Sequence, residues 1–114
     1  MLPVLLLAPS AAAETLPPGM LVKTLPSGLT AVAAPLPGSG LVAVQTWMDV
    51  GSRHETVPGT TGYAHFFEHL MFHGTPSRSG AERKKELMLM GAEENAWTSD
   101  DFTCYHVLAP AGAM

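Results

Sequence analysis

Two histidines and a glutamate in residues 62–75, GYAHFFEHLMFHGT, are the side chains in this sequence best suited to chemistry. If the segment is a helix, His65 and His69 lie on one face, about one turn or ~6 Å apart. Two imidazoles in that arrangement can converge on one metal ion, with Zn–N distances of ~2.0–2.1 Å. Glu68 borders the same face and can reach a water on the metal without being a ligand. The spacing therefore predicts a zinc site.

The residues between these three are apolar, so we expect the helix to be buried. Burying three titratable groups without partners would cost several kcal/mol. A zinc ion would be the partner of both histidines, and its charge would keep Glu68 ionised. The alternative is a hydrogen-bonded pair of core histidines with a buried Glu–His ion pair. We favour the metal because His-x-x-Glu-His is the inverted form of the zinc-peptidase helix His-Glu-x-x-His.

Helix signals surround the trio. A helix is predicted over residues 61–73, because Thr60 or Thr61 can cap its start and Gly74 can end it. A second helix is predicted over residues 79–90, where apolar residues form one side and a glycine follows the end.

Strand signals precede and follow these helices. Residues 41–50 predict the clearest strand, since the even-numbered residues are almost all apolar. Residues 97–108 are rich in Thr, Tyr, Phe and Val and predict another. Residues 21–34 predict a hairpin around Pro26-Ser27-Gly28. The order of strands, helix, helix and strand predicts an α+β fold, with a sheet of mostly antiparallel strands packed with helices.

The N-terminus has the pattern of an incomplete signal peptide. Residues 2–8 are apolar, and Ala11-x-Ala13 fits a small-residue cleavage site, although no Lys or Arg precedes them. We therefore predict a partial signal peptide over residues 1–13, a linker over 14–20 and one domain over 21–114. The protein would be exported, to the bacterial periplasm or the medium. The apolar run is too short to span a membrane, and the alternative is an apolar tail.

Composition limits the function classes. The chain has 114 residues, enough for one small domain. A net charge of −4, with only 6 Lys and Arg, argues against nucleic-acid binding. The single cysteine, Cys104, has no internal disulfide partner and is predicted to be a small core residue.

Several motifs in order resemble the pitrilysin/insulinase family of zinc metallopeptidases, the inverzincins. GYAHFFEHLMFHGT closely resembles the signature of that family. Upstream, VQTWMDVGSRHETVPGTTG resembles the family's strand, Gly-Ser loop and acidic residue, which is Glu55 here. Downstream, GAEENAWTSDDFTCYHVLAP resembles a family segment whose positions here are Asn95, Ala96, Thr98, Asp101, Thr103 and Tyr105. The resemblance covers roughly residues 20–110.

This resemblance implies a partial insulinase-like domain with roles for five residues. His65 and His69 would bind zinc, and Glu68 would be the general base that activates zinc-bound water to attack a peptide carbonyl. The strand from Asn95 onward would be an edge strand that pairs with extended peptides or partly unfolded proteins. Asn95 and Ala96 would therefore contact the substrate. The alternative for Asn95 is a turn residue before a strand.

The third zinc ligand of the family is a Glu on a later helix, several dozen residues after the motif. No such helix follows within this chain, and a catalytic zinc needs three protein ligands. No spacing argues for the acidic residues that could substitute, which are Glu93, Glu94, Asp100 and Asp101. We therefore expect the N-terminal part of a catalytic domain, truncated, which alone binds zinc weakly and cleaves slowly or not at all.

The remaining histidines are not expected to be ligands. His73 would lie ~12 Å along the helix axis from His65, too far to share its metal. His54 is expected in a loop and His106 in a strand.

Two functions compete on this reading of the sequence. One is a truncated zinc endopeptidase, whose partners would be a peptide or unfolded-protein substrate and a second insulinase-like domain or subunit. The other is a non-catalytic homologue or fragment that serves as a binding module. The intact trio favours the peptidase. A structural zinc site is weaker, because such sites favour four closed ligands and would leave Glu68 without a role.

Overall fold

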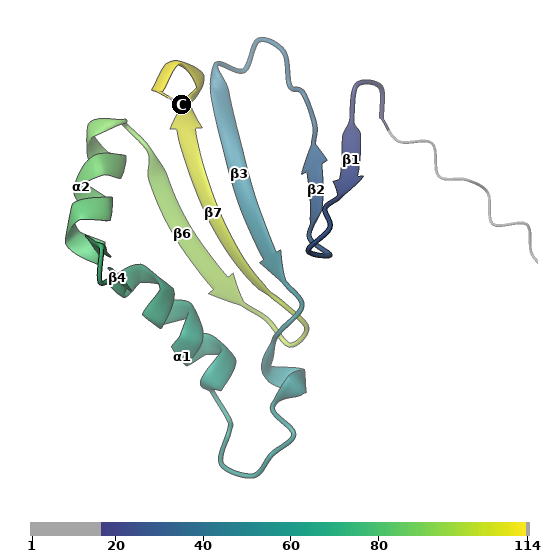
Figure 1. The fold of residues 1–114 in the computed structure, drawn as a ribbon, viewed down its shortest axis with the longest axis vertical. Helices are drawn as coiled ribbons and strands as arrows, with labels where there is room; N and C mark the ends of the chain where they lie inside the picture. The colour runs from purple at the N-terminus through teal and green to yellow at the C-terminus, as the bar shows by residue number, and fades with distance from the viewer. Residues whose placement is uncertain (1–16, 114) are drawn as a thin grey trace, which may run out of the picture. The chain divides into compact units, whose positions relative to one another are not determined.

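The structure is a computed structural model that describes residues 17–113, drawn as a ribbon in Figure 1. The chain divides into two compact units between Pro37 and Gly38. The predicted signal peptide, residues 1–13, lies outside the described residues, and so do residues 14–16 of the predicted linker. None of the helices in residues 17–113 has the length and apolar character needed to span a membrane.

The first unit contains an antiparallel hairpin of β1 (Leu21–Thr24) and β2 (Thr30–Ala33). Its turn is closed by a hydrogen bond of 2.9 Å from Gly28 N to Leu25 O. Gly28 has a φ of +87°, a left-handed conformation that residues with a side chain rarely adopt. The predicted hairpin is confirmed.

The second unit is built on a three-stranded antiparallel sheet with the order β3-β7-β6, so β6 lies at an edge (Figure 1). The strands are β3 (Leu41–Met48), β6 (Glu93–Thr98) and β7 (Thr103–Pro110). The strand predicted over residues 41–50 is confirmed and ends at Met48. With its helices, this sheet makes the predicted α+β fold.

The single strand predicted over residues 97–108 is wrong, because a turn divides this segment between β6 and β7. Ser99 builds the turn: its backbone N donates to Phe102 O at 2.9 Å, and its Oγ accepts from Phe102 N at 3.1 Å. A short polar side chain that hydrogen-bonds nearby backbone groups favours a turn over a continuous strand. The strand-forming residues on both sides of Ser99 obscured that signal.

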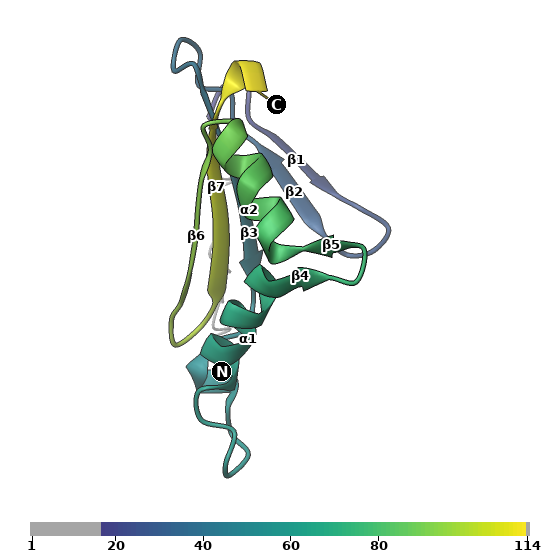
Figure 2. The same ribbon diagram turned by 90° about the vertical axis from the view of Figure 1, so that its left-hand side faces the viewer.

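Two helices lie on one side of the sheet, next to β6 (Figure 2). α1 (Tyr63–Leu70) continues as a 3-10 turn, Met71–His73, and α2 is Gly80–Leu89. Both predicted helices are therefore confirmed. Between them lies a short strand pair that the sequence did not predict, β4 (Gly74–Thr75) and β5 (Arg78–Ser79).

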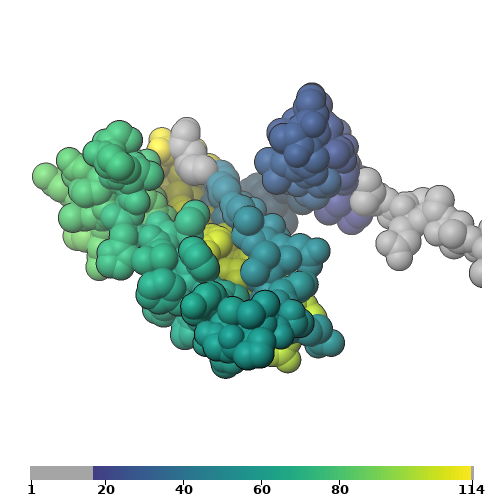
Figure 3. Space-filling model, turned by 60° about the horizontal axis from the view of Figure 1, so that its bottom comes forward, coloured from purple at the N-terminus to yellow at the C-terminus, as the bar shows by residue number. Residues whose placement is uncertain are grey.

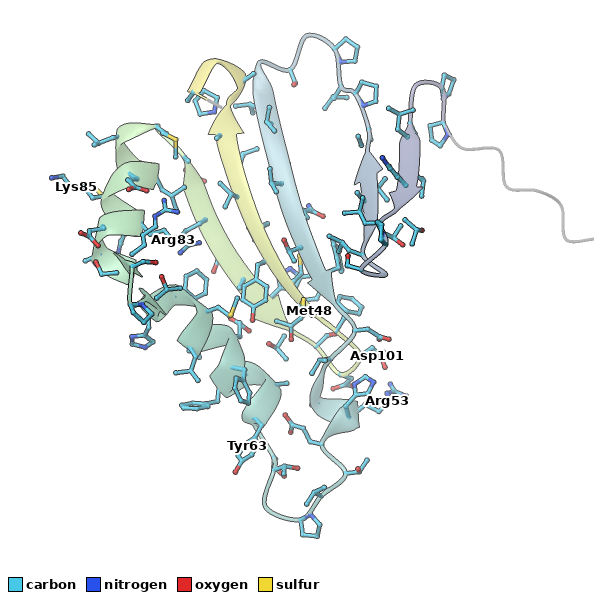
Figure 4. The ribbon with its side chains drawn as sticks, in the orientation of Figure 1. Met48, Arg53, Tyr63, Arg83, Lys85 and Asp101 are labelled. Carbon is cyan, nitrogen blue, oxygen red and sulfur yellow. The ribbon has the colours of Figure 1, made fainter. Side chains whose placement is uncertain are left out.

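α2 is capped locally and held to the sheet by one arginine. Ser79 Oγ accepts from Glu82 N at 3.2 Å, and Glu82 Oε2 accepts from Ser79 N at 2.9 Å, which forms a capping box. Arg83 points from α2 toward β6 (Figure 4) and forms an ion pair with Glu94. Its guanidinium also lies 5.6 Å from the centre of the Phe72 ring.

The strand register decides which side chains face the helices. Thr98 pairs with Thr103, and Ala96 pairs with Tyr105, whose side chain lies beside α1. Because side chains alternate along a strand, Ala96 and Thr98 are on the helix side of β6 and Asn95 is on the opposite side.

The side of the sheet away from the helices holds an aromatic cluster over Cys104. In the ladder, Cys104 lies between Trp47 and Trp97, whose rings are 5.6 Å apart and edge to face. Phe102 packs against both indoles. Cys104 is consequently only 1% exposed, so its predicted core position is confirmed, and burial raises the pKa of its thiol.

Gly51 lies where the chain after β3 passes the β6–β7 turn. It is buried and precedes a 3-10 turn, Ser52–His54, whose first N–H donates to Ser99 O at 3.1 Å. A Cβ on Gly51 would lie 2.5 Å from Ser99 O and 2.6 Å from the carbonyl carbon of Asp100. Since both are backbone atoms, this close approach requires glycine.

Gly51→Ala should destabilise the second unit by about 1–3 kcal/mol, because its methyl group would push the two backbone segments apart. Urea unfolding followed by circular dichroism measures the change. The matched control is Gly112→Ala in the 3-10 turn Ala111–Ala113, where nothing lies within 4 Å of an added Cβ. Equal urea midpoints for the two variants would contradict the packing described here.

Candidate metal centre

His65 and His69 lie one turn apart on α1, and their Nε2 atoms are 3.1 Å from each other. The ring centres are 4.7 Å apart and the ring planes are inclined by 43°. Both side chains are exposed, so the prediction that the whole trio is buried is wrong for the histidines. The reason is that much of α1 is uncovered: even Phe67, an apolar residue of this helix, is 59% exposed.

The geometry of this pair fits two positions of a zinc site. Two nitrogens bound to one tetrahedral zinc at ~2.0–2.1 Å lie ~3.4 Å apart, close to the observed separation. The same distance also fits a direct hydrogen bond, in which the N–H of one imidazole donates to the lone pair of the other. A metal ion could replace that shared proton with little movement of either side chain.

A third protein ligand is not found in residues 17–113, where no three His, Cys, Asp or Glu side chains converge. Asp100 accepts a hydrogen bond of 2.8 Å from Ser52 Oγ, and Asp101 forms a 2.8 Å ion pair with Arg53, which lies beside it in Figure 4. Glu94 is occupied by the ion pair with α2. Asp100, Asp101 and Glu94 are therefore engaged elsewhere, whereas Glu93 is exposed in β6. The histidines form a partial site.

The other histidines belong to different parts of the fold. His54 Nδ1 accepts from Gly51 N at 3.2 Å in the loop after β3. His73 ends the 3-10 turn after α1, and His106 lies in β7 opposite Asn95.

Glu68 is buried, with only 7% of its surface exposed, as predicted for this member of the trio. Thr98 Oγ1, on β6, donates a hydrogen bond of 2.5 Å to Glu68 Oε2. On the same side of the sheet, burial and then the negative charge of Glu68 raise the pKa of Tyr105. The sequence did not predict the hydrogen bond between Thr98 and Glu68, because the two residues lie 30 positions apart.

An apolar groove of about 710 Å³ lies beside α1, between this helix and the sheet. In Figure 3, yellow atoms of β7 are visible between the teal atoms of α1 and the blue atoms of β3. The trio His65, Glu68 and His69 does not line this groove. The groove and the partial metal site therefore occupy different sides of α1. The apolar lining of the groove includes Met48, Val50, Phe67, Leu70 and Met71.

A side chain from outside α1 caps its start. The N-cap residue is Gly62, with a φ of +90° and no side chain to offer. Instead, the carboxylate of Glu55 accepts hydrogen bonds from Gly62 N at 2.7 Å and from Ala64 N at 2.8 Å. These bonds, led by the one from Ala64, lower the pKa of Glu55. The positive end of the helix backbone thus faces a negative charge.

The predicted caps, Thr60 and Thr61, are wrong. Thr60 Oγ1 donates to Val57 O at 2.6 Å, within the loop. The glycine immediately before the helix was a signal that a cap had to come from elsewhere, but no local spacing pointed to Glu55.

Asn95 and Ala96 both lie in the edge strand β6, so the alternative of a turn residue before a strand is wrong for Asn95. Asn95 is exposed on the side away from the helices, and Ala96 is half-buried on the helix side. Asn95 Oδ1 accepts a hydrogen bond of 2.9 Å from Ala96 N.

Sequence comparisons point to a peptidase family. The family described as insulinase, peptidase family M16, matches residues 32–114. An uncharacterised zinc protease of Mycobacterium tuberculosis is 44% identical over 87 residues, which are 75% of this chain and 20% of that relative. The beta subunit of the mitochondrial-processing peptidase of Neurospora crassa is 43% identical over 86 residues, 75% of this chain and 18% of that relative. The chain thus spans about a fifth of the length of these curated relatives.

Two solved structures share the fold. A protease from Helicobacter pylori has a TM-score of 0.75 and 36% identity, over 82% of this chain and 22% of that one. The periplasmic protease PqqL from Escherichia coli has a TM-score of 0.77 and 31% identity, over 87% of this chain and 11% of that one.

Glu55→Gln should weaken the start of α1, because the amide carries no charge for the two N–H groups. The pKa of Glu55 is lower in the folded chain, so its stabilisation is present above the unfolded pKa and is lost as the pH falls through the folded pKa. We expect the amide proton NMR shifts of Gly62 and Ala64 to move over that pH range, and to stay constant in the variant.

The control is Glu93→Gln, which changes an exposed carboxylate of β6 and should leave this titration intact. If the two amide signals still moved with pH in Glu55→Gln, a different group would be the cap.

Proposed function

The chain belongs to the insulinase family of peptidases, peptidase family M16, and we propose that it is part of a zinc-dependent endopeptidase. The reaction would be hydrolysis of peptide bonds in extended peptides or partly unfolded proteins. The observation that carries this proposal is the approach of the His65 and His69 Nε2 atoms to 3.1 Å, beside the buried carboxylate of Glu68. The activity is proposed for the whole gene product, because this chain spans about a fifth of its relatives.

Zinc is the metal named in relatives of this family. His65 and His69 would hold it through their Nε2 atoms. When bound, zinc supplies a Lewis acid that polarises the peptide carbonyl and makes water more acidic. The third protein ligand would lie outside this chain, since residues 17–113 bring no third suitable side chain to the pair.

Glu68 would act as the general base. Its carboxylate would accept a proton from the attacking water and then deliver that proton to the nitrogen of the leaving amine. Its position supports this role, because it follows the metal-side histidine His65 by less than one helical turn and is anchored through Oε2. Oε1 is then the oxygen that receives the proton.

Substrate would bind as an added strand at β6. This strand lies at the edge of the three-stranded sheet, so its outer backbone groups have no strand partner in the described part of the chain. An extended peptide could pair there, in contact with Asn95 and Ala96. Such backbone pairing selects extended chains more than particular side chains.

A second insulinase-like domain or subunit would complete the assembly, as the name of the Neurospora crassa relative, a beta subunit, suggests. We also propose export, with residues 1–13 as the signal peptide, because one structural neighbour is named as periplasmic. A non-catalytic binding module is the alternative function, and no observation favours it.

Glu68→Gln in the whole gene product should lower turnover of a peptide by a factor of about 10²–10⁴, because the proton acceptor is lost. Its zinc content, measured by atomic emission after dialysis, should be unchanged. His65→Ala and His69→Ala should lose both zinc and activity.

The matched control is Glu86→Gln, which alters an exposed ion pair between α2 and Arg78 of β5 and should leave turnover and zinc unchanged. Loss of zinc from Glu68→Gln would contradict the general-base role and make Glu68 a ligand. Full turnover in Glu68→Gln would also contradict the general-base role, whereas no turnover in the unchanged whole gene product would favour the binding module.

Export predicts a mature N-terminus directly after Ala13 when the whole gene product is expressed in a bacterium. Mass spectrometry of the periplasmic fraction checks the new terminus. Ala13→Arg should block cleavage, because the site requires a small residue. An intact N-terminus on periplasmic protein, or protein found in the cytoplasm alone, would count against a signal peptide.

A further inference from the structure

We propose that Thr98 is a positioning residue for Glu68: its hydroxyl holds one carboxylate oxygen and leaves the other oriented for proton transfer. The inference rests on the proposed function and concerns how its general base is held. Thr98 lies in β6, and Glu68 lies in α1.

Burial makes this contact necessary. Glu68 is 7% exposed, and a carboxylate taken out of water requires a hydrogen-bond donor. Thr98 Oγ1 supplies one at 2.5 Å, a length typical of an O–H donor bound to an ionised carboxylate. Within residues 17–113, no second donor to this side chain is found.

Thr98 is itself held firmly. It forms the last rung of the β6–β7 ladder with Thr103, immediately before the turn that Ser99 closes. Thr103 is 4% exposed, and its hydroxyl donates to Val50 O at 2.9 Å. The Thr98–Thr103 pair is therefore held both by its own turn and by the segment that follows β3.

The hydroxyl protons of Thr98 and Thr103 determine which group donates in the hydrogen bond between Thr98 and Glu68. Each threonine has one hydroxyl proton. The proton of Thr103 goes to Val50 O, and the proton of Thr98 goes to Glu68. The two hydroxyl oxygens lie 3.3 Å apart, and neither has a proton left to donate to the other. Thr98 thus acts as a donor to the carboxylate, and Glu68 loses the rotational freedom that an unanchored carboxylate would have.

The test uses the zinc-loaded whole gene product and an internally quenched peptide. Thr98→Val keeps the shape and removes the donor, so kcat should fall roughly 10–100-fold. KM and the zinc content should stay within about twofold of the unchanged protein, as expected when only transition-state stabilisation is lost. Thr98→Ser restores the hydroxyl and should recover most of kcat, which a merely structural role would not predict.

The matched control is Thr46→Val, which removes a threonine hydroxyl from the same side of the sheet, in β3, without touching Glu68. It should leave kcat unchanged. An equal loss of kcat in Thr46→Val and Thr98→Val, or no recovery in Thr98→Ser, would overturn the proposal.

Glu68→Gln separates failure of this inference from failure of the proposed function. If Glu68→Gln is inactive while Thr98→Val has full kcat, the positioning role is wrong and the general base stands. If Glu68→Gln is active, the general-base role in the proposed function is wrong, and if the unchanged protein has no activity, the proposed function itself is wrong.

A crystal structure of the metal-free protein gives a readout that does not depend on activity. The bond from Thr98 Oγ1 to Glu68 Oε2 should be present in the unchanged protein, and Glu68 should adopt a different rotamer in Thr98→Val. Absence of the bond, or an unchanged Glu68 rotamer in the variant, would overturn the proposal.

Discussion

A carboxylate that is removed from water must find a donor, and in this fold that requirement joins the helix to the sheet edge. Glu68 reaches across from α1 to Thr98, the last residue of β6. This side-chain contact thereby links the edge strand to the helix that carries His65 and His69. If substrate binds at the edge strand as we propose, this relation would bring the scissile bond beside Glu68.

The loop after β3 connects the sheet to the start of α1 in the same way, through a carboxylate that accepts hydrogen bonds. Gly51 passes so close to Ser99 that two backbone segments touch, which places the following residues beside the β6–β7 turn. From that loop, Glu55 reaches the first amides of α1. Two carboxylates therefore hold α1 in place. Glu55 accepts hydrogen bonds from backbone amides at the start of the helix, and Glu68 accepts one from the hydroxyl of Thr98 in β6.

The local pattern of apolar and polar residues predicted most of the helices and strands. It did not predict the contacts between residues that lie far apart in the sequence. The helices and the first strands have strong periodicity and clear end residues, so they could be predicted. The turn at Ser99 was missed because strand-forming residues surround it, and the cap by Glu55 was missed because no short-range rule joins it to Gly62. The exposure of His65 depends on how much of α1 is covered, which is a property of packing. For the same reason Thr98 could be aligned with a family segment but could not be paired with Glu68.

The aromatic cluster over Cys104 gives the chain a built-in optical reporter. Trp47 and Trp97 are the two tryptophans of the sequence, and their rings are 5.6 Å apart. Intrinsic tryptophan fluorescence therefore comes from one place, where β3, β7 and β6 lie side by side. Any event that separates β6 from β7 alters both emitters together, while events confined to α2 leave them in place. Because Trp97 is a residue of the edge strand, a peptide added there would change the environment of one emitter without any attached dye.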